Sequence, residues 1–309
     1  MTRQIFRNLT KLILSLSALA IFSASALAQG AVINTSDMRP GSILFFNRYI
    51  SSTGTPGQGD TQINVTNVSA TLFASFHLFL VDGSTCTIAD FSGGLTPNQT
   101  MSFKMSEYDP GITGYIVLVA TDGSVPTQFN FLIGNAYIRE NDGRQAVLQA
   151  VSVVKHSEGS VEPKNDGSFS MLFNGTEYER LPSALAVTSF NSETTDSNTL
   201  SIYSPTRDLT LGSTEAVSIF SLLFDDNEKS LSSSFVVRCY RTDTLTTLFN
   251  RLGGINRHVP TGKTGWIKLN ATNRPLLGSV VFKGRVFAGG YNLPAIALLP
   301  SYEISLPVF

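Results

Sequence analysis

Histidine is the side chain that most often serves as a general base at neutral pH, and this chain has three, His77, His156 and His258. His77 alternates with apolar neighbours in "SFHLFLV", which is typical of a residue on a strand face or in a core. The other two lie in polar stretches beside Lys155 and Arg257, where exposed loops are expected. The sequence has no His-Glu-x-x-His motif, no Cys pair at zinc spacing and no Gly-x-Ser-x-Gly elbow. We therefore expect no catalytic residue, no metal site and no cofactor, and predict that the protein is not an enzyme.

Asp and Glu side chains could act as catalytic groups in place of histidine, because a glycosidase needs only two carboxylic acids about 5 to 10 Å apart. The candidates at predicted strand ends are Asp82, Asp109, Glu140 and Asp142. Turn-forming acids belong at the same places, so a carboxylate-based hydrolase is the least favoured function. The densest acidic stretch, "DDNE" from Asp225, lacks the alternate spacing and central Gly of a calcium loop and is predicted to be a hairpin turn.

Cys86 and Cys239 are the two cysteines of the chain, and each lies in a predicted strand, "STCTIADF" and "FVVRCYRTD". In an oxidising compartment they could form a disulfide, which would close a loop of about 150 residues. A small buried thiol explains each cysteine equally well. The sequence leaves both interpretations open.

Aromatic side chains on a β-sandwich surface can act as platforms for sugars, since their rings offer a large apolar face beside polar groups. The candidate ligand-contact aromatics are Tyr108, Tyr115, Trp266 and Tyr291. An exposed, coplanar pair among them would favour a carbohydrate-binding protein, and burial of all four would remove that alternative.

The first 28 residues have the pattern of a signal peptide. Three basic residues accompany an apolar run from Leu12 to Phe22, and "ALA" at 26–28 fits the small-x-small cleavage rule. The run is shorter than the roughly 20 residues of a spanning helix, and no later stretch is long and apolar enough, so no transmembrane span is expected after cleavage. We expect export to the periplasm, the cell surface or the extracellular space.

Composition narrows the class of partner. The 309-residue chain is 42% hydrophobic and 15% charged, which excludes an intrinsically disordered protein. Three of its 22 basic residues lie in the leader, which leaves 19 against 23 acidic residues. Because nucleic-acid binding asks for a basic stripe, no nucleic-acid partner is predicted.

From residue 40 onward, apolar residues alternate or come in short runs bounded by Gly, Pro, Asn and Asp, which predicts β-strands. Seven candidates fall within about 95 residues, the spacing of a sandwich. The segment "RQAVLQAVSVV" from Arg144 fits either a helical turn or a strand. A polar stretch at 156–170 then separates two halves with similar strings, such as "ASFHLFLVDG" from Ala74 and "VSIFSLLFDD" from Val217.

We therefore predict an all-β fold with two tandem β-sandwich domains. The predicted boundaries are a signal peptide at 1–28, the first domain at 29–155, a linker or long loop at 156–183 and the second domain at 184–309.

Two motifs in residues 58–135 suggest a known class of module. They are "NVTNVSA" from Asn64 and the corner "GLTPNQT", in which Asn98 stands where such modules usually have Gly. The order of strands and corner resembles the exported immunoglobulin-like modules of bacterial surface proteins, including the cell-adhesion-related type. The resemblance implies immunoglobulin-like sandwiches in a non-enzymatic protein of the cell envelope or extracellular space, with a structural, adhesion or assembly role. Its partners would be envelope proteins, the extracellular matrix or glycans.

Overall fold

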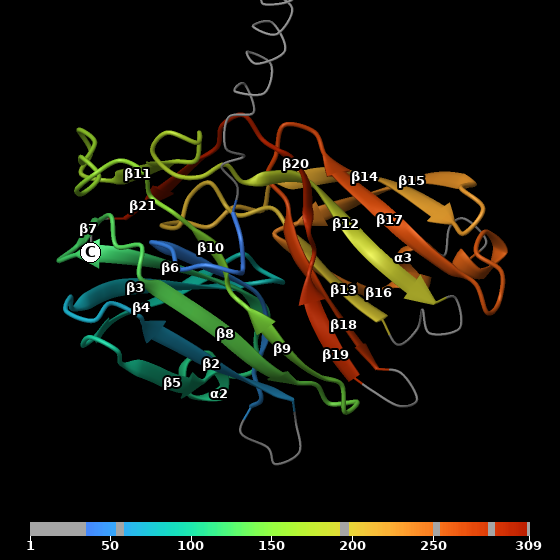
Figure 1. Ribbon diagram of the computed structural model, residues 1–309, viewed down its shortest axis with the longest axis horizontal. Helices are drawn as coiled ribbons and strands as arrows, with labels where there is room; N and C mark the ends of the chain where they lie inside the picture. Colours follow the sequence, from blue (N-terminus) through green and yellow to red (C-terminus); the bar gives the residue numbers. More distant parts are fainter. Residues whose placement is uncertain (1–34, 54–58, 192–197, 250–253, 284–287, 308–309) are drawn as a thin grey trace, which may run out of the picture. The chain divides into compact units, whose positions relative to one another are not determined.

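The computed structural model describes residues 35–53, 59–191, 198–249, 254–283 and 288–307. Residues 34–309 form one compact unit, and its regular structure is almost entirely β-strand, so the chain is an all-β protein (Figure 1). The predicted leader lies outside the described residues. Among the residues that the structure describes, no helix has the length and apolar character that a membrane crossing requires.

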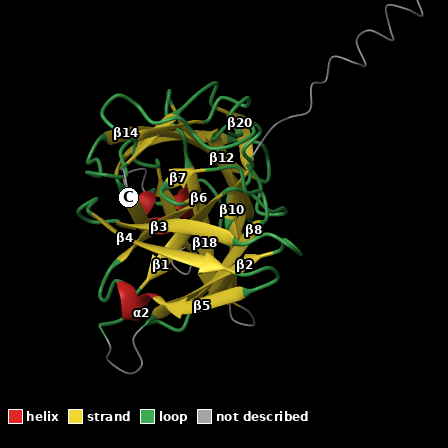
Figure 2. Ribbon diagram, turned by 90° about the vertical axis from the view of Figure 1, so that its left-hand side faces the viewer, coloured by secondary structure: helices red, strands yellow, loops and turns green. Residues whose placement is uncertain are grey.

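Two antiparallel sheets form the first sandwich. In spatial order, the strands of one sheet are β10 (Val151–Val153), β1 (Ile43–Ile50), β6 (Thr113–Asp122), β3 (Ala74–Asp82) and β4 (Ile88–Leu95), with β7 (Val125–Pro126) beside β6. Those of the other are β5 (Thr100–Lys104), β2 (Asp60–Asn67), β8 (Leu132–Arg139) and β9 (Gln145–Gln149). Figure 2 shows β2 and β5 below β3 and β4, with the short helix α2 (Met105–Tyr108) beside β5.

The second sandwich repeats this arrangement with two further antiparallel sheets. One contains β15 (Ser230–Arg238), β14 (Ala216–Asp225), β17 (Thr264–Ala271), β12 (Pro182–Asn191) and β20 (Ala295–Leu298). The other contains β16 (Tyr240–Thr244), β13 (Asn198–Tyr203), β18 (Leu277–Lys283) and β19 (Ala288–Asn292). The short helices α3 (Leu245–Leu248) and η3 (Ile255–Arg257) follow β16.

A two-stranded sheet links the middle of the chain to its end. Strand β11 (Phe169–Leu172) pairs antiparallel with β21 (Glu303–Leu306). Phe169 and Met171 of β11 are buried. The segment 156–183, which is predicted to connect the two domains, thus contains a strand, β11, that contributes to a core. The two domain boundaries predicted around it stay a prediction.

Strands β1, β3 and β6 of the first sandwich are buried on both faces. Leu44 and Ile116 point into the core between the two sheets of that sandwich. Phe45 and Val117, one residue further along β1 and β6, belong to a different core that also contains residues of β11, β21 and the second sandwich. Since successive side chains of a strand point to opposite faces, burial of both faces requires unbroken apolar runs such as "YIVLVA" from Tyr115.

Three strands of the second sandwich, β14, β15 and β17, have only one buried face. On β14, Val217 and Ile219 point into the core of this sandwich, whereas Ser218 and Phe220 are exposed. This alternation is the ordinary pattern of an antiparallel sheet with one face in water. The segment from Arg144, which the sequence left ambiguous, forms β9 and β10.

Two turns predicted from the sequence are confirmed. In the corner between β4 and β5, Asn98 has a left-handed backbone (φ 59°), and the N–H of Thr96 donates to Oε1 of Gln99 over 2.8 Å. A left-handed residue is usually Gly or Asn, which explains the Asn at this position. In the hairpin between β14 and β15, the carboxylate of Asp225 accepts the backbone N–H of Asn227 over 2.9 Å.

Candidate functional site

The two sandwiches meet along a buried apolar layer, which we call the joint. Its core contains residues of both sandwiches and of the β11–β21 pair. At its centre the ring of Tyr115 on β6 stacks on that of Tyr203 on β13, with centroids 3.9 Å apart and an interplanar angle of 16°. The hydroxyl of Tyr115 accepts the N–H of Thr206 over 3.1 Å, and burial raises the pKa of that hydroxyl. Tyr115 is fully buried, so it is a core residue and not the ligand-contact aromatic that the sequence suggested.

Buried polar groups beside this tyrosine stack are paired across the joint. The hydroxyl of Tyr203 donates to Oδ1 of Asn47 over 2.8 Å. The amide nitrogen of Asn47 in turn donates to the carbonyl oxygen of Gly278 over 3.0 Å and to Oδ1 of Asn292 over 2.8 Å. Because an unpaired buried amide is costly, these bonds favour one relative placement of β1 and β18.

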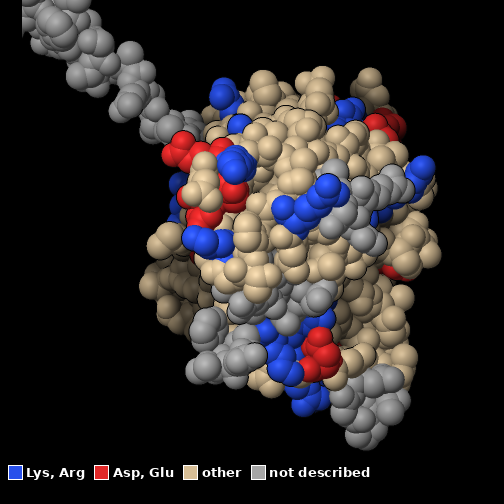
Figure 3. Space-filling view, turned by 90° about the vertical axis from the view of Figure 1, so that its right-hand side faces the viewer, with Lys and Arg blue, Asp and Glu red and all other residues tan. Residues whose placement is uncertain are grey.

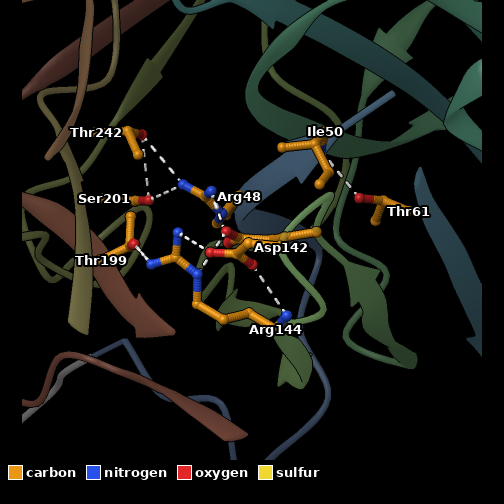
Figure 4. A network of polar contacts seen from close by, with 9 residues as sticks. Arg48, Ile50, Thr61, Asp142, Arg144, Thr199, Ser201 and Thr242 are labelled. Atoms are coloured by element: carbon orange, nitrogen blue, oxygen red, sulfur yellow. Dashed lines mark hydrogen bonds and ion pairs between the residues drawn. The ribbon is translucent and has the colours of Figure 1, made fainter. Parts of the chain in front are cut away.

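A charged network extends the joint toward solvent (Figure 4). Nη2 of Arg48 on β1 lies 2.7 Å from Oε1 of Glu140, and the two side chains are 5% and 8% exposed. Figure 4 shows the guanidinium of Arg48 pointing toward the second sandwich, where Nη1 donates to Oγ of Ser201 over 2.5 Å and to Oγ1 of Thr242 over 3.1 Å. Arg48 thus connects an acid of its own sandwich to two hydroxyls of the other.

Arg144 is the second cation of the network. Its Nε lies 3.0 Å from Oε2 of Glu140, its Nη2 lies 2.6 Å from Oδ2 of Asp142, and its Nη1 donates to the hydroxyl of Thr199 on β13. Burial would raise the pKa of Asp142, but the backbone N–H and the guanidinium of Arg144 outweigh it and hold that pKa below its usual value. The network contains two cations and two anions, so it is neutral as a whole.

Glu140 and Asp142 also line an open pocket of about 470 Å³, which is the arrangement a carboxylate-based hydrolase would need. Such an enzyme requires one protonated carboxylic acid, usually a group with a raised pKa. Here the pKa of Asp142 is lowered, and each oxygen of Glu140 faces a different arginine. The geometry therefore favours a structural role for this pair.

Of the other two predicted carboxylates, Asp82 lies at the end of β3 and Asp109 directly follows the short helix α2. The hydroxyl of Tyr49 donates to Oδ2 of Asp109 over 2.6 Å, and burial, together with the charge of Asp82, raises the pKa of Asp109. The carboxylate of Asp82 accepts the hydroxyls of Ser84 and Thr85 over 2.8 and 2.6 Å. Burial would raise the pKa of Asp82, but these turn hydrogen bonds lower it. Asp82 is thus engaged in its own turn.

His77 lies in an open groove of about 830 Å³ on the β3–β4 hairpin. Its Nε2 is 2.6 Å from Oδ2 of Asp90, and Ser75 and Ser92 line the same groove. In a serine-hydrolase triad the orienting carboxylate is buried, whereas the side chain of Asp90 is 52% exposed. Sequence reasoning missed Asp90, because its pairing with His77 depends on the hairpin register. Among the residues that the structure describes, no group of three or more His, Cys, Asp or Glu is placed to hold a metal ion.

The remaining candidate aromatics do not form a common platform. Tyr108 is 46% exposed and stacks on Phe91 of the first sandwich, with centroids 4.6 Å apart. Trp266 is 37% exposed and stacks on Phe224 of the second sandwich, with centroids 4.5 Å and planes 9° apart. Tyr291 is partly buried against the core of the second sandwich. The structure therefore separates these residues and gives Trp266 an aromatic neighbour that the sequence did not single out.

Trp266 belongs to a broader exposed face, which we call the β14 face. Phe220 and Val236 are 43% and 47% exposed on the same outer side of this sheet. In the β14–β15 pairing, Ser234 lies directly opposite Phe220. Ser232, two positions earlier in β15, lies opposite Leu222. The sequence signal for this face was the presence of large apolar residues, Phe220, Leu222 and Phe224, at outward positions of β14, where a one-sided sheet needs apolar residues only on its inner face.

Cys86 and Cys239 are both buried in the joint, and both are free thiols. Both approach the carbonyl oxygen of Asp82, which accepts the backbone N–H of Cys86 over 2.9 Å and Sγ of Cys239 over 3.3 Å. The structure thus places the two cysteines close together, which the sequence alone could not show.

Charged side chains are sparse on the side of the molecule drawn in Figure 3. Among the described residues there, Lys and Arg lie in small groups, several of them next to Asp or Glu, and uncharged residues occupy most of the surface.

Comparisons with known proteins identify no family. No protein-family model matches the chain, and no curated protein matches it. Among solved structures, Thermotoga maritima 1070 has 13% sequence identity to this chain and a TM-score of 0.30. The match covers 40% of this chain and 100% of the Thermotoga maritima chain. The major pilin from Streptococcus pyogenes is 11% identical, with a TM-score of 0.18 over 86% of this chain and 97% of its own. Similarities of this size assign neither a family nor a function, and the resemblance to immunoglobulin-like modules stays a prediction.

Proposed function

We propose that this chain is an exported, non-enzymatic protein that serves as a rigid structural unit of a cell-envelope or extracellular assembly. The main observation that supports the proposal is the buried joint between the two sandwiches. The leader pattern supports export, and the neutral, ion-paired state of the Arg48 network supports the absence of catalysis in the pocket beside it.

The joint is built like the interior of one domain. Tandem domains that move independently usually meet through small, polar interfaces. Here the contact buries a tyrosine stack and a continuous apolar cluster, and the amide of Asn47 and the guanidinium of Arg48 are hydrogen-bonded to the opposite sandwich. Rotation of one sandwich against the other would break all of these contacts at once. A load or contact at one sandwich is therefore transmitted to the other, as a structural unit requires.

Denaturation of the purified full chain tests the rigidity. Unfolding in urea, followed by circular dichroism and by the fluorescence of Trp266, should give one coincident transition, because neither sandwich is complete without the joint. Two separated transitions would show independently stable sandwiches and would contradict a rigid unit.

The functional part of the proposal needs a cellular measurement. A tagged chain expressed in a bacterial host should lose its leader, leave the cytoplasm and be recovered, after crosslinking, in complexes with envelope or extracellular components. The same purified chain should turn over no substrate in panels of glycosides, esters and peptides. Turnover that Glu140→Gln or His77→Ala abolishes would overturn the non-enzymatic proposal, as would a chain retained uncleaved in the cytoplasm.

Glycan binding at the β14 face is the second candidate, favoured by the exposed Phe224–Trp266 stack beside serine side chains. On a glycan array, any glycan bound by the wild type should bind about tenfold more weakly to Trp266→Ala, the loss expected for one stacking ring. Tyr108→Ala, which removes a similarly exposed ring from the first sandwich, is the matched control and should bind normally. Binding to no glycan, or equal loss in both variants, would remove this candidate.

A further inference from the structure

Cys86 lies in the tight turn that connects β3 to β4. Its backbone is left-handed (φ 64°), and its N–H donates to the carbonyl oxygen of Asp82 over 2.9 Å. A loop of the second half of the chain covers the turn, because Gly212 packs so closely on the carbonyl oxygen of Cys86 that a Cβ at this position would clash with it. The position of Cys86 is thus held by contacts on both sides.

Cys239 lies at the corner where the chain passes from β15 to β16, which belong to opposite sheets of the second sandwich. Its backbone is also left-handed (φ 62°), and its Sγ donates to the same carbonyl oxygen of Asp82 over 3.3 Å. The two cysteines therefore converge on one oxygen, and each thiol lies close enough to the other to affect its pKa. Cys86 is 4% exposed and Cys239 is 7% exposed.

We propose that Cys86 and Cys239 are a dithiol oxidation site, which a disulfide oxidant converts into a covalent bond between the first and the second sandwich. The two S–H bonds break and one S–S bond forms. Two electrons and two protons pass to the oxidant, a protein disulfide or a low-molecular-weight disulfide such as oxidised glutathione, which is reduced to two thiols. The bond lies across the joint and closes a loop of about 150 residues, so it restricts the unfolded chain strongly.

Burial determines when the bond can form. Thiol–disulfide exchange needs a thiolate and access to it. Burial raises the pKa of both thiols, and core residues cover them, so the folded dithiol reacts slowly. Oxidation should therefore be fast while the chain folds and slow once the joint is complete. The same burial protects the finished disulfide from reductants.

The test uses the full chain refolded with a mixture of reduced and oxidised glutathione. Peptide mapping without reductant should recover the fragment containing Cys86 linked to the fragment containing Cys239, and a thiol assay on the denatured protein should find no free thiol. Oxidised glutathione added to the folded, reduced chain should give the same bond at least tenfold more slowly. Two free thiols after oxidative refolding, or a disulfide between two chains, overturns the proposal.

A second readout does not depend on whether a variant folds. Reduction of the oxidised wild type should lower its Tm by an amount on the order of 10 °C, because the loop constraint is lost. The matched control, Cys86→Ser/Cys239→Ser, should show the same Tm with and without reductant. An equal response of both proteins overturns the stabilising role. Since all of these measurements use the purified chain, their failure leaves the proposed cellular function untouched.

Discussion

Replacing Glu140 by Gln should destabilise the folded chain by about 3 to 5 kcal/mol, the usual cost of removing one partner from a buried ion pair. The structure places the nitrogen of Arg48 2.7 Å from the oxygen of Glu140, with side chains 5% and 8% exposed. An arginine keeps its charge at every pH at which the protein folds. The variant would therefore leave the Arg48 cation buried without its counterion, with the amide oxygen of Gln as a weaker partner.

An exposed ion pair of the same length provides the matched control. Nζ of Lys164 lies 2.7 Å from Oε1 of Glu303, but these side chains are 40% and 51% exposed. Glu303→Gln should cost only about 0 to 1 kcal/mol, because water solvates the lysine that remains. Both variants convert Glu to Gln at an ion pair of the same length, but Glu140 is buried and faces two arginines, whereas Glu303 is half exposed and faces one lysine.

The free energies of unfolding come from urea titrations followed by circular dichroism and by the fluorescence of Trp266, the one tryptophan in the sequence. Arg48→Met combined with Glu140→Gln should lose clearly less than the sum of the two single changes, because the second change removes the charge that the first one leaves unpaired. The reasoning is refuted if Glu140→Gln costs no more than Glu303→Gln, or if the two changes at the buried pair are additive.

Three further predictions concern pH, burial and backbone conformation. The pKa of Asp142 is lowered from 3.8 by Arg144, so its stabilising contribution is present at pH 7 and is lost as the pH falls through the folded-state pKa. The pKa of Asp109 is raised from 3.8 by burial, so its contribution is present only at low pH and is lost as the pH rises through the folded-state value. Urea titrations from pH 3 to pH 7 should therefore show Asp142→Asn to be less stable than the wild type at pH 7 and Asp109→Asn to be more stable, with both differences shrinking toward pH 3; equal differences at all pH values would contradict this. Tyr115→Ala should cost about 3 to 5 kcal/mol in the same assay, whereas Tyr108→Ala should cost less than about 1 kcal/mol, since only the first ring is buried; similar losses would mean that the joint is not packed as described. Asn98→Ala should cost about 1 kcal/mol and Asn98→Gly less than about 0.5 kcal/mol, because only Ala is strained in the left-handed backbone; equal effects in the urea midpoint would rule out this explanation.

Local features of the fold could be predicted because neighbouring residues encode them. Alternating apolar residues predicted the strands, and the corner at Asn98 and the hairpin at Asp225 were predicted from turn chemistry alone. Neighbouring residues did not, however, predict whether an individual side chain is buried or exposed. Tyr115 and Tyr108 are both tyrosines near turns, and only the tertiary structure shows that one is in a core and the other at the surface.

The candidate site depended on contacts between distant parts of the chain. Cys86 and Cys239 could be named as a pair, but their adjacency arises from two separate turns that meet on one carbonyl oxygen. The pairing of Arg48 with Glu140, and its bond to Ser201, has no sequence signature, because each residue lies on a different strand or turn.

The amino-acid sequence by itself therefore determined the strands, their turns and the leader pattern, since period, turn residues and local polarity act over a few neighbouring positions. Only the tertiary structure decided that the second face of β1 and β6 is covered, that Arg48 pairs with Glu140 beside a pocket, and that the two cysteines meet on one carbonyl oxygen. These features arise from packing between segments far apart in the chain, such as Arg48 and Glu140, which are separated by 92 positions, and residues that far apart leave no periodic trace in the sequence.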